Sequence, residues 1–228
     1  MQINKIVALV PMRHHSQRVP GKNYRPLAGK PLFHHILQTL KACPEIVEIV
    51  VDTDSPEIME SIHVQFPDVV LIERPEDLRA DTVSMNEILL YDTHQIQADL
   101  YLQTHSTNPL LKTETINRAI QSLKDNFPVH DSLFGVTRVQ ARLWDELTRP
   151  INHNPAILLQ TQDLPKVFME NSCIYLFTRK TLEDRRNRVG DRPMMFEIDQ
   201  SESWDIDEEL DFLIVDLLMK QKINQTPS

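Results

Sequence analysis

Five basic side chains stand close together in a segment that follows an early apolar run of the sequence. The segment is VPMRHHSQRVPGKNYRPLAGKPL, residues 10–32, and its cations are Arg13, Arg18, Lys22, Arg25 and Lys30. The whole chain carries 24 Lys and Arg against 33 Asp and Glu, a net charge of −9. Two of its four glycines, Gly21 and Gly29, also lie in this segment. Local positive charge in an acidic chain is typical of a pocket for a small anion.

The basic segment contains neither of the two common glycine-rich phosphate motifs. It lacks the GxxxxGK[ST] pattern of a P-loop and the GxGxxG pattern of dinucleotide-binding folds. The remaining common design wraps a nucleoside triphosphate with Arg and Lys side chains, so the segment predicts a nucleotidyltransferase loop. The alternative is that Arg13 and Lys22 are solvated surface charges, as we expect for Arg18.

Two carboxylates near the other end of the chain suit a cation. Asp205 and Asp207 flank Ile206, and alternate residues of an extended segment point to one side. Both carboxylates can therefore face one ion while Ile206 packs inward. Carboxylate and phosphate oxygens suit Mg²⁺, which we expect here as cofactor. The alternative is that these aspartates cap the helix expected from Glu208 onward.

Apolar runs alternate with helix starts along the first 139 residues. The expected strands are residues 6–10, 46–52, 69–73, 98–103 and 132–139, and the expected helices begin at Pro31, Ser55, Ser84 and Thr113. This alternation predicts an α/β fold with a doubly wound, mostly parallel sheet. Ligands of such sheets bind beyond the carboxyl ends of the strands, where the basic segment follows the first strand.

The second half of the chain is less regular. Residues 140–170 contain Pro150, Pro155 and Pro165, which predicts an excursion from the sheet, either a flap or a dimerisation arm. Residues 171–178 have strand character, residues 181–189 are polar and expected to be exposed, and a last helix is expected over 208–220. We expect one domain over residues 1–228, with residues 140–170 as an excursion for dimerisation or for the acceptor site.

The composition excludes several classes of protein. A hydrophobic content of 41% and a charged content of 25% are those of an ordinary globular protein, and the net negative charge argues against a broad nucleic-acid surface. No apolar run is long enough to span a membrane, and the N-terminus does not resemble a signal peptide. Cys43 and Cys173 form no CxxC and no disulfide framework, so we expect buried thiols and a cytoplasmic protein.

The basic segment resembles the signature of a known enzyme family. Its pattern R-x-x-S-x-x-x-P-x-K-N is similar to that of the CMP-sugar synthetases, cytidylyltransferases that activate acidic sugars such as sialic acid. The residues that carry it are Arg13, Ser16, Pro20, Lys22 and Asn23. The following P-L-x-G-K-P-L, residues 26–32, matches as well. The family has a Rossmann-like nucleotidyltransferase fold, which agrees with the predicted sheet.

The resemblance continues in the same order along most of the chain. The further blocks are VDTD (51–54), RPEDLRADTVS (74–84), LQTHSTNPL (102–110), NSCIY (171–175) and DIDEELD (205–211). Residues 140–168 carry no clear match and coincide with the family's dimer arm. The resemblance therefore implies a homodimer, with Trp144 at the interface or at the pocket.

The resemblance also implies roles for particular residues. Arg13 and Lys22 are the implied catalytic residues, which hold the triphosphate of CTP and stabilise its developing charge. The implied nucleotide contacts are Arg13, Ser16, Lys22, Asn23, Arg74, Val83 and Ser84. The implied substrate contacts are Gln103 and Asn171, and the implied metal ligands are Asp205 and Asp207. For Arg74, the alternative to a contact with the cytosine carbonyl is a surface ion pair with Glu73 or Glu76.

The implied reaction is transfer of CMP from CTP to an acidic sugar. The anomeric hydroxyl of a 2-keto-3-deoxy sugar acid attacks the α-phosphorus in line, and pyrophosphate leaves. Positioning and charge neutralisation supply the catalysis, and no general base is identified. The partners are CTP and the acidic sugar, with no nucleic acid and no membrane.

The acceptor remains open at this stage. Lys22-Asn23 and the turn after Gln103, where His105 is at the edge of the expected pocket, are closer to sialic-acid enzymes than to the Kdo type. Met169 stands where sialic-acid enzymes tend to hold an arginine, and Arg138, Arg142 and Lys166 are the candidate substitutes. His14 and His15 also depart from the family pattern, without an assigned role beyond phosphate or neighbour contacts. A related nonulosonic acid, a phosphonate or other non-sugar acceptor, and a catalytically silent nucleotide-binding protein are the alternatives.

Overall fold

The computed structural model describes residues 3–225, with side chains over residues 3–222. Its centre is a seven-stranded sheet in the order β5-β4-β1-β6-β8-β7-β9. The strands are β1 (Ile6–Leu9), β4 (Ile46–Thr53), β5 (Val70–Glu73), β6 (Leu100–Gln103), β7 (Ser132–Val139), β8 (Val167–Phe177) and β9 (Pro193–Glu197). Only β8 runs against its neighbours β6 and β7, so the predicted mostly parallel sheet is confirmed.

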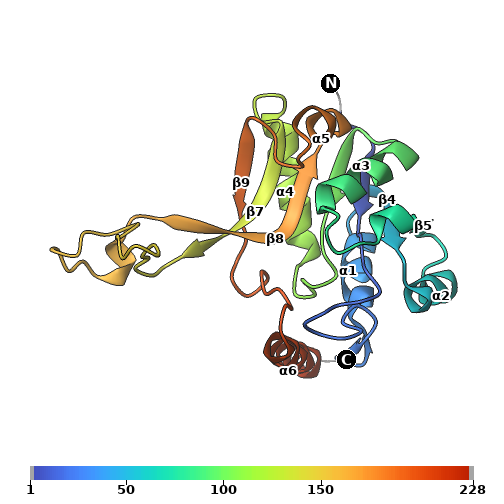
Figure 1. Cartoon of the computed structure of the whole chain (residues 1–228), viewed down its shortest axis with the longest axis horizontal. Coiled ribbons are helices and arrows are strands. Elements are labelled where there is room, and N and C mark those ends of the chain that lie inside the picture. Colours follow the sequence, from blue (N-terminus) through green and yellow to red (C-terminus); the bar gives the residue numbers. More distant parts are fainter. Residues whose placement is uncertain (1–2, 226–228) are drawn as a thin grey trace.

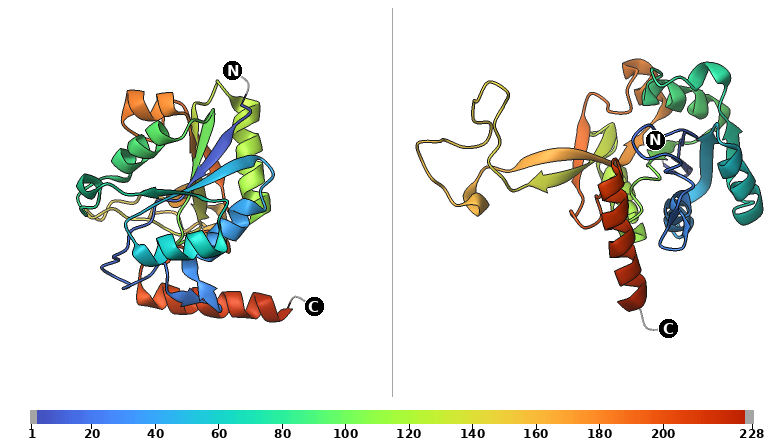
Figure 2. Two further views of the ribbon diagram at one scale, coloured as in Figure 1. Left: turned by 90° about the vertical axis from the view of Figure 1, so that its right-hand side faces the viewer. Right: turned by 60° about the horizontal axis from the view of Figure 1, so that its bottom comes forward.

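Helices cover both faces of the sheet (Figure 1; Figure 2, left). The helices are α1 (Leu32–Lys41), α2 (Pro56–Gln65), α3 (Met85–Gln95), α4 (Thr113–Asn126), α5 (Arg179–Arg185) and α6 (Glu209–Gln225). Two short strands, β2 (Pro26–Leu27) and β3 (Lys30–Pro31), form a hairpin inside the basic segment. No helix within residues 3–225 combines the length and apolarity that crossing a membrane requires.

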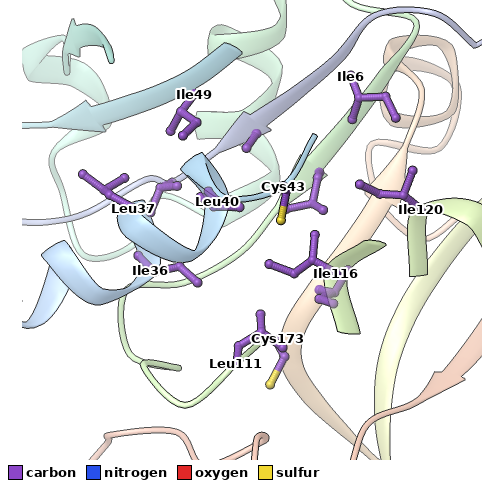
Figure 3. Packing of buried hydrophobic residues seen from close by; sticks show 14 of the residues in the cluster. Ile6, Ile36, Leu37, Leu40, Cys43, Ile49, Leu111, Ile116, Ile120 and Cys173 are labelled. Atoms are coloured by element: carbon purple, nitrogen blue, oxygen red, sulfur yellow. The ribbon is translucent and has the colours of Figure 1, made fainter. Parts of the chain in front are cut away.

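The alternation of β1 explains why the sheet is covered twice. Ile6 and Ala8 pack in one apolar cluster with side chains of α1, α2 and α4, whereas Val7 and Leu9 pack in a second cluster with α3 and α5. A strand buried on both faces is what a continuous apolar run predicts. Figure 3 shows the first cluster, in which Cys43 and Cys173 are free, buried thiols, as expected.

The predicted excursion projects away from the body of the molecule (Figure 1; Figure 2, right). β7 and β8 stay paired from Val136–Glu170 to Val139–Val167, and the chain between them forms an extended arm. The arm is residues 140–166. Its exposed apolar side chains are Trp144, Leu147, Ile151, Ile157, Leu158 and Leu159.

Residues 179–197 differ from the prediction. Residues 183–187 of the segment expected to be polar and exposed are exposed. The first part of that segment belongs to α5, which begins because Thr178 accepts a hydrogen bond from the Thr181 amide at 3.1 Å. Leu182 is buried and packs with Tyr101 and Phe177, so tertiary contacts outweigh the polar composition. Strand β9 and the β2–β3 hairpin are also absent from the prediction.

Candidate active site

A cavity of about 570 Å³ opens beyond the carboxyl end of β1. Segments far apart in the sequence line it: the loop after β1, the residues after β5, the turn after β6, Ser172 of β8 and the segment before α6. Eight of the predicted site residues line this cavity together: Arg13, Ser16, Lys22, Asn23, Arg74, Val83, Asp205 and Asp207. Ser84, Gln103 and Asn171 are not among its lining residues. The position agrees with the rule for doubly wound sheets.

Asn23 fixes the shape of the loop after β1. Its side-chain amide donates to the Arg13 carbonyl at 2.7 Å and accepts from the Ser106 hydroxyl at 2.7 Å. Ser16 contributes at the same place, since its hydroxyl accepts from the Val19 amide at 3.3 Å. Asn23 is buried, and these contacts tie both ends of the loop to the turn after β6. Its implied contact with the nucleoside stays a prediction.

Lys22 points its ammonium group at the segment before α6. Only 13% of its side chain is exposed, and Nζ donates to the Ile206 carbonyl at 2.5 Å. Nζ also lies 3.7 Å from the Asp207 carboxylate. Burial lowers the pKa of Lys22, while the charges of Asp207 and Asp205 act in the opposite direction. The structure thus brings the basic loop and the predicted metal ligands into one site.

Arg13 and Arg18 are paired with acids across the cavity. Arg13 forms an ion pair with Asp81, which also accepts a hydrogen bond from Gln17 at 2.6 Å. Arg18 was expected to be solvated, but it lines the cavity and bonds Asp207 at 2.7 Å. Sequence reasoning missed it because its partner lies 189 positions away.

Asp205 and Asp207 lie as the alternation predicted. Both line the cavity, while Ile206 between them is fully buried in a third apolar cluster. Asp211 in the first turn of α6 holds the segment before the helix, since its carboxylate accepts from the backbone amides of Asp207 and Glu208 at 3.1 and 2.8 Å. The alternative role of Asp205 and Asp207 as helix caps stays a prediction.

The donor set at Asp205 and Asp207 fits a cation that also binds phosphate. Oδ1 of Asp205 is buried without a hydrogen-bond partner, and burial raises the pKa of this carboxyl, opposed by a hydrogen bond from Thr107. Within the described residues no group of three or more His, Cys, Asp or Glu side chains could hold a metal ion. Two carboxylates and the oxygens of a bound phosphate would together make the hard ligand set that Mg²⁺ prefers.

Arg74 is the most deeply buried cation of the site. Its side chain is 1% exposed, and Nε donates to Oδ1 of Asp52 on β4 at 2.5 Å. The alternative of a surface ion pair is wrong, because Glu73 pairs instead with Arg79 at 3.3 Å. Nη1 of Arg74 is buried without a partner, although the residue lines the cavity.

Val83 and Ser84 have different positions relative to the cavity. Val83 lines it and closes a turn, its amide donating to the Ala80 carbonyl at 3.0 Å. Ser84 forms the predicted capping box of α3: its hydroxyl accepts from the Glu87 amide at 3.3 Å, and its own amide donates to the Glu87 carboxylate at 2.8 Å. A nucleotide contact of the Ser84 side chain stays a prediction.

A bulge between β7 and β8 places Ser172, rather than Asn171, at the cavity. The register shifts between Phe134 and Val136, and Ser172 adopts a positive φ of 57°. Asn171 is buried behind it, where it donates to the Thr137 hydroxyl at 3.0 Å and accepts from the Cys173 amide at 3.2 Å. The predicted substrate residue therefore supports the bulge that presents its neighbour.

Gln103 likewise acts behind His105. Arg188 donates to its Oε1 at 2.6 Å, which leaves Nε2 to lie 2.9 Å from Nε2 of His105. Because the amide donates here, His105 carries its proton on Nδ1. Burial, with the charges of Arg188 and Lys22, lowers the pKa of His105 to about 3 and keeps the ring neutral.

Arg188 was missed by sequence reasoning. Its guanidinium lies 3.5 Å from the ring centre of Tyr175, and burial lowers its pKa. Tyr175 is on β8, so no local pattern around Arg188 shows this contact.

His14 and His15 have separate positions. The His14 amide donates to Asp54 at 2.7 Å, and its ring lies 3.0 Å from the Ser55 hydroxyl and 3.1 Å from the Glu57 carboxylate. The ring also stacks on Tyr24 at 5.5 Å, so His14 ties the basic loop to the start of α2. His15 lines the cavity.

Comparisons with known proteins agree with this site. Residues 7–223 match the family model described as "Cytidylyltransferase". CMP-N,N'-diacetyllegionaminic acid synthase of Legionella pneumophila is 30% identical over 95% of this chain and 97% of that protein. N-acylneuraminate cytidylyltransferase A of Danio rerio is 26% identical over 92% of this chain and 50% of that protein.

Solved structures share the fold at lower sequence identity. CMP:2-keto-3-deoxy-manno-octonic acid synthetase complexed with CTP superposes with a TM-score of 0.76 and 18% identity, covering 96% of this chain and 99% of that one. A 4-diphosphocytidyl-2C-methyl-D-erythritol synthase gives a TM-score of 0.66 and 19% identity, covering 94% and 98%. The family match and the 30% identity over nearly the whole chain show that this protein belongs to the cytidylyltransferase family, among the CMP-sugar synthetases.

Proposed function

We propose that this protein transfers CMP from CTP to the anomeric hydroxyl of an acidic 2-keto-3-deoxy sugar and releases pyrophosphate. The observation that carries the proposal is the meeting of Lys22 with Asp205 and Asp207 in one cavity. A triphosphate needs cationic side chains, and a divalent cation needs hard oxygen ligands. Both lie here within one nucleotide-sized space.

The phosphate end of the cavity supplies charge neutralisation. Arg13 and Arg18 exchange their pairing with Asp81 and Asp207 for phosphate oxygens, and Lys22 stabilises the charge that develops on the α-phosphoryl group. Mg²⁺, which Asp205 and Asp207 would hold, supplies further neutralisation of the phosphates when bound.

For the acceptor, we propose a nonulosonic acid such as N,N'-diacetyllegionaminic acid. The 30% identity to the Legionella pneumophila synthase named for this sugar supports the choice. Neutral His105 offers an Nδ1–H donor, and Ser172 offers a hydroxyl, beside Lys22 in the cavity. These neutral groups suit the hydroxyl and amide groups of a sugar acid.

The carboxylate of the acceptor needs a cationic partner, and the cations that one chain places in the cavity are all used by CTP in this proposal. The cationic residues that line the cavity in the described chain are Arg13, Arg18, Lys22 and Arg74, all assigned to CTP. We propose a homodimer in which the arm, residues 140–166, reaches the partner's cavity. Its exposed apolar side chains support an interface, and we expect this dimer in the cytoplasm.

A pyrophosphate-release screen tests the function. CTP and Mg²⁺ are combined with sialic, legionaminic, pseudaminic and Kdo acids and with small phosphonates. We expect release with a nonulosonic acid and none without Mg²⁺. If no acceptor led to pyrophosphate release, the proposed function would be wrong. If a phosphonate were preferred, the cytidylyltransferase activity would stand, but the proposed sugar acceptor would be wrong. Light scattering tests the dimer, with Leu158→Asp in the arm expected to shift it to monomer.

A further inference from the structure

Two buried carboxylates lie near the guanidinium of Arg74: Asp52 bonds it directly, and Asp92 is within reach of its charge. Asp52 lies at the end of β4, and Asp92 lies on α3; each is 1% exposed. The carboxyl group of Asp92 lies beside that of Asp52, and each affects the pKa of the other. Asp52 Oδ1 accepts from Arg74 Nε, but its Oδ2 has no donor, and neither oxygen of Asp92 has one.

The hydrogen bonds and charges of Arg74, Asp52 and Asp92 balance only if the two acids share one proton. Carboxylates are acceptors when ionised, so two of them in contact leave their oxygens unsatisfied and repel each other. One proton on Asp92 turns it into a donor for the free Oδ2 of Asp52. Arg74 then faces one negative charge, and the group of three is electrically neutral, as a buried cluster requires.

The electrostatic surroundings identify Asp92 as the protonated member. Burial, and then the charge of Asp52, raise the pKa of Asp92 to about 9. Burial also raises the pKa of Asp52, but the direct bond from Arg74 opposes this shift and favours the ionised form of Asp52. The charged groups that act on the pair are Arg74 from the end of β5 and, on Asp52, Asp54 from the loop after β4. None of these residues touches Asp205 or Asp207.

We propose that Asp92 is a positioning residue for nucleotide recognition, which shares a proton with Asp52 and so holds the Arg74 guanidinium toward the cavity. The inference rests on the proposed use of CTP. Arg74 keeps Nη1 without a protein partner and only a 3.4 Å contact from Nη2 to the Asp52 carbonyl, so it has N–H groups to spare. Since Asp52 neutralises its charge, this corner suits the carbonyl of an uncharged base better than a phosphate.

Two substitutions of Asp92 separate the shared proton from simple packing. Asp92→Asn keeps a donor for Asp52, whereas Asp92→Leu keeps approximate volume and has none. We expect Asp92→Leu to raise the KM for CTP about tenfold with a smaller change in kcat, and Asp92→Asn to stay within about threefold of wild type near pH 7. Asp125→Asn, an exposed acid on α4, is the control for loss of one charge. Equal KM values for Asp92→Leu and wild type, or no rescue by Asn, would overturn the proposal.

Urea unfolding without ligand tests the proton independently of the function. The folded protein keeps a proton on Asp92 that the unfolded chain releases above its ordinary pKa, so this group lowers stability as the pH rises from about 4 to about 9. Asp92→Asn needs no proton, and the unfolding midpoint should shift in its favour between pH 5 and pH 9. A difference that does not change with pH would contradict the shared proton. If wild type bound no CTP, the proposed function would fail while this test still decided the proton.

Discussion

The two ends of the cavity hold their arginines in opposite ways. At the end proposed to bind the base, Arg74 is almost wholly buried and bonds Asp52, which lies on the neighbouring strand β4. At the end proposed to bind the phosphates, Arg13 and Arg18 are about half exposed and pair with Asp81 and Asp207, two acids of loops. One end is built into the core, and the other lies at the surface.

The difference shows how one pocket can be rigid and exchangeable at once. When a buried ion pair is broken, water does not reach the remaining charge, so the loss of stability is several kcal/mol. An exposed ion pair contributes only up to about 1 kcal/mol. Asp81 and Asp207 can therefore yield their arginines to phosphate oxygens at little cost. In the proposed binding mode, the base end is preset by folding, whereas the phosphate end is completed by the bound nucleotide.

The largest expected effect is on stability at the base end. Arg74→Met removes the cation that bonds Asp52 and acts on Asp92. It should lower the free energy of unfolding by about 3–5 kcal/mol, the usual cost of leaving a buried charge unpaired. Urea unfolding at pH 8 measures this. Arg185→Met is the matched control, because Arg185 pairs with exposed Asp191 at 3.1 Å and its loss should cost less than about 1 kcal/mol. Similar losses in the two variants would erase the contrast between the ends.

The next effect is on catalysis at the phosphate end. Lys22→Ala removes the ammonium that faces Asp207 and the Ile206 carbonyl, and kcat should fall by about 10²- to 10³-fold with the fold retained. Steady-state pyrophosphate release and circular dichroism check both parts. Lys30→Ala, on strand β3 and outside the cavity lining, should keep wild-type kcat. A Lys22→Ala enzyme within tenfold of wild type would remove Lys22 from the mechanism.

Asp205→Asn tests the carboxylate that has no protein partner at Oδ1. The substitution should raise the Mg²⁺ concentration for half-maximal activity by about 10- to 100-fold, at least the effect of disturbing a supporting ligand. A Mg²⁺ titration of pyrophosphate release measures it. Asp68→Asn, which only loses the surface contact with Lys41, is the control. An unchanged Mg²⁺ requirement would exclude Asp205 as a ligand.

Local patterns predicted the parts of this architecture that local patterns determine. The apolar runs and helix caps predicted the alternating strands and helices. The spacing of residues 205–207 predicted that Asp205 and Asp207 face the cavity while Ile206 packs in the core. Helix α5 was not predicted, because Leu182 is held by core contacts that the polar sequence around it does not reveal.

The acceptor side of the site depended on tertiary structure and was predicted less well. A bulge shifts the β7–β8 register by three positions between Phe134 and Val136, and Ser172 rather than Asn171 lines the cavity. Arg188 is positioned by Tyr175 and Gln103, which come from two other strands. No spacing within residues 181–189 carries that information.

The smallest expected effect sharpens the claim that the phosphate end is exchangeable. Asp81 is 59% exposed and pairs with Arg13 and Gln17 where the triphosphate is proposed to bind. If Asp81 only competes with phosphate for Arg13, Asp81→Asn should lower the KM for CTP by about two- to fivefold, the range of an exposed ion pair. Initial rates at varied CTP measure the change, and added salt should reduce it because exposed pairs are screened. A raised KM would instead mean that Asp81 holds Arg13 in its productive position, and the phosphate end would then be as preset as the base end.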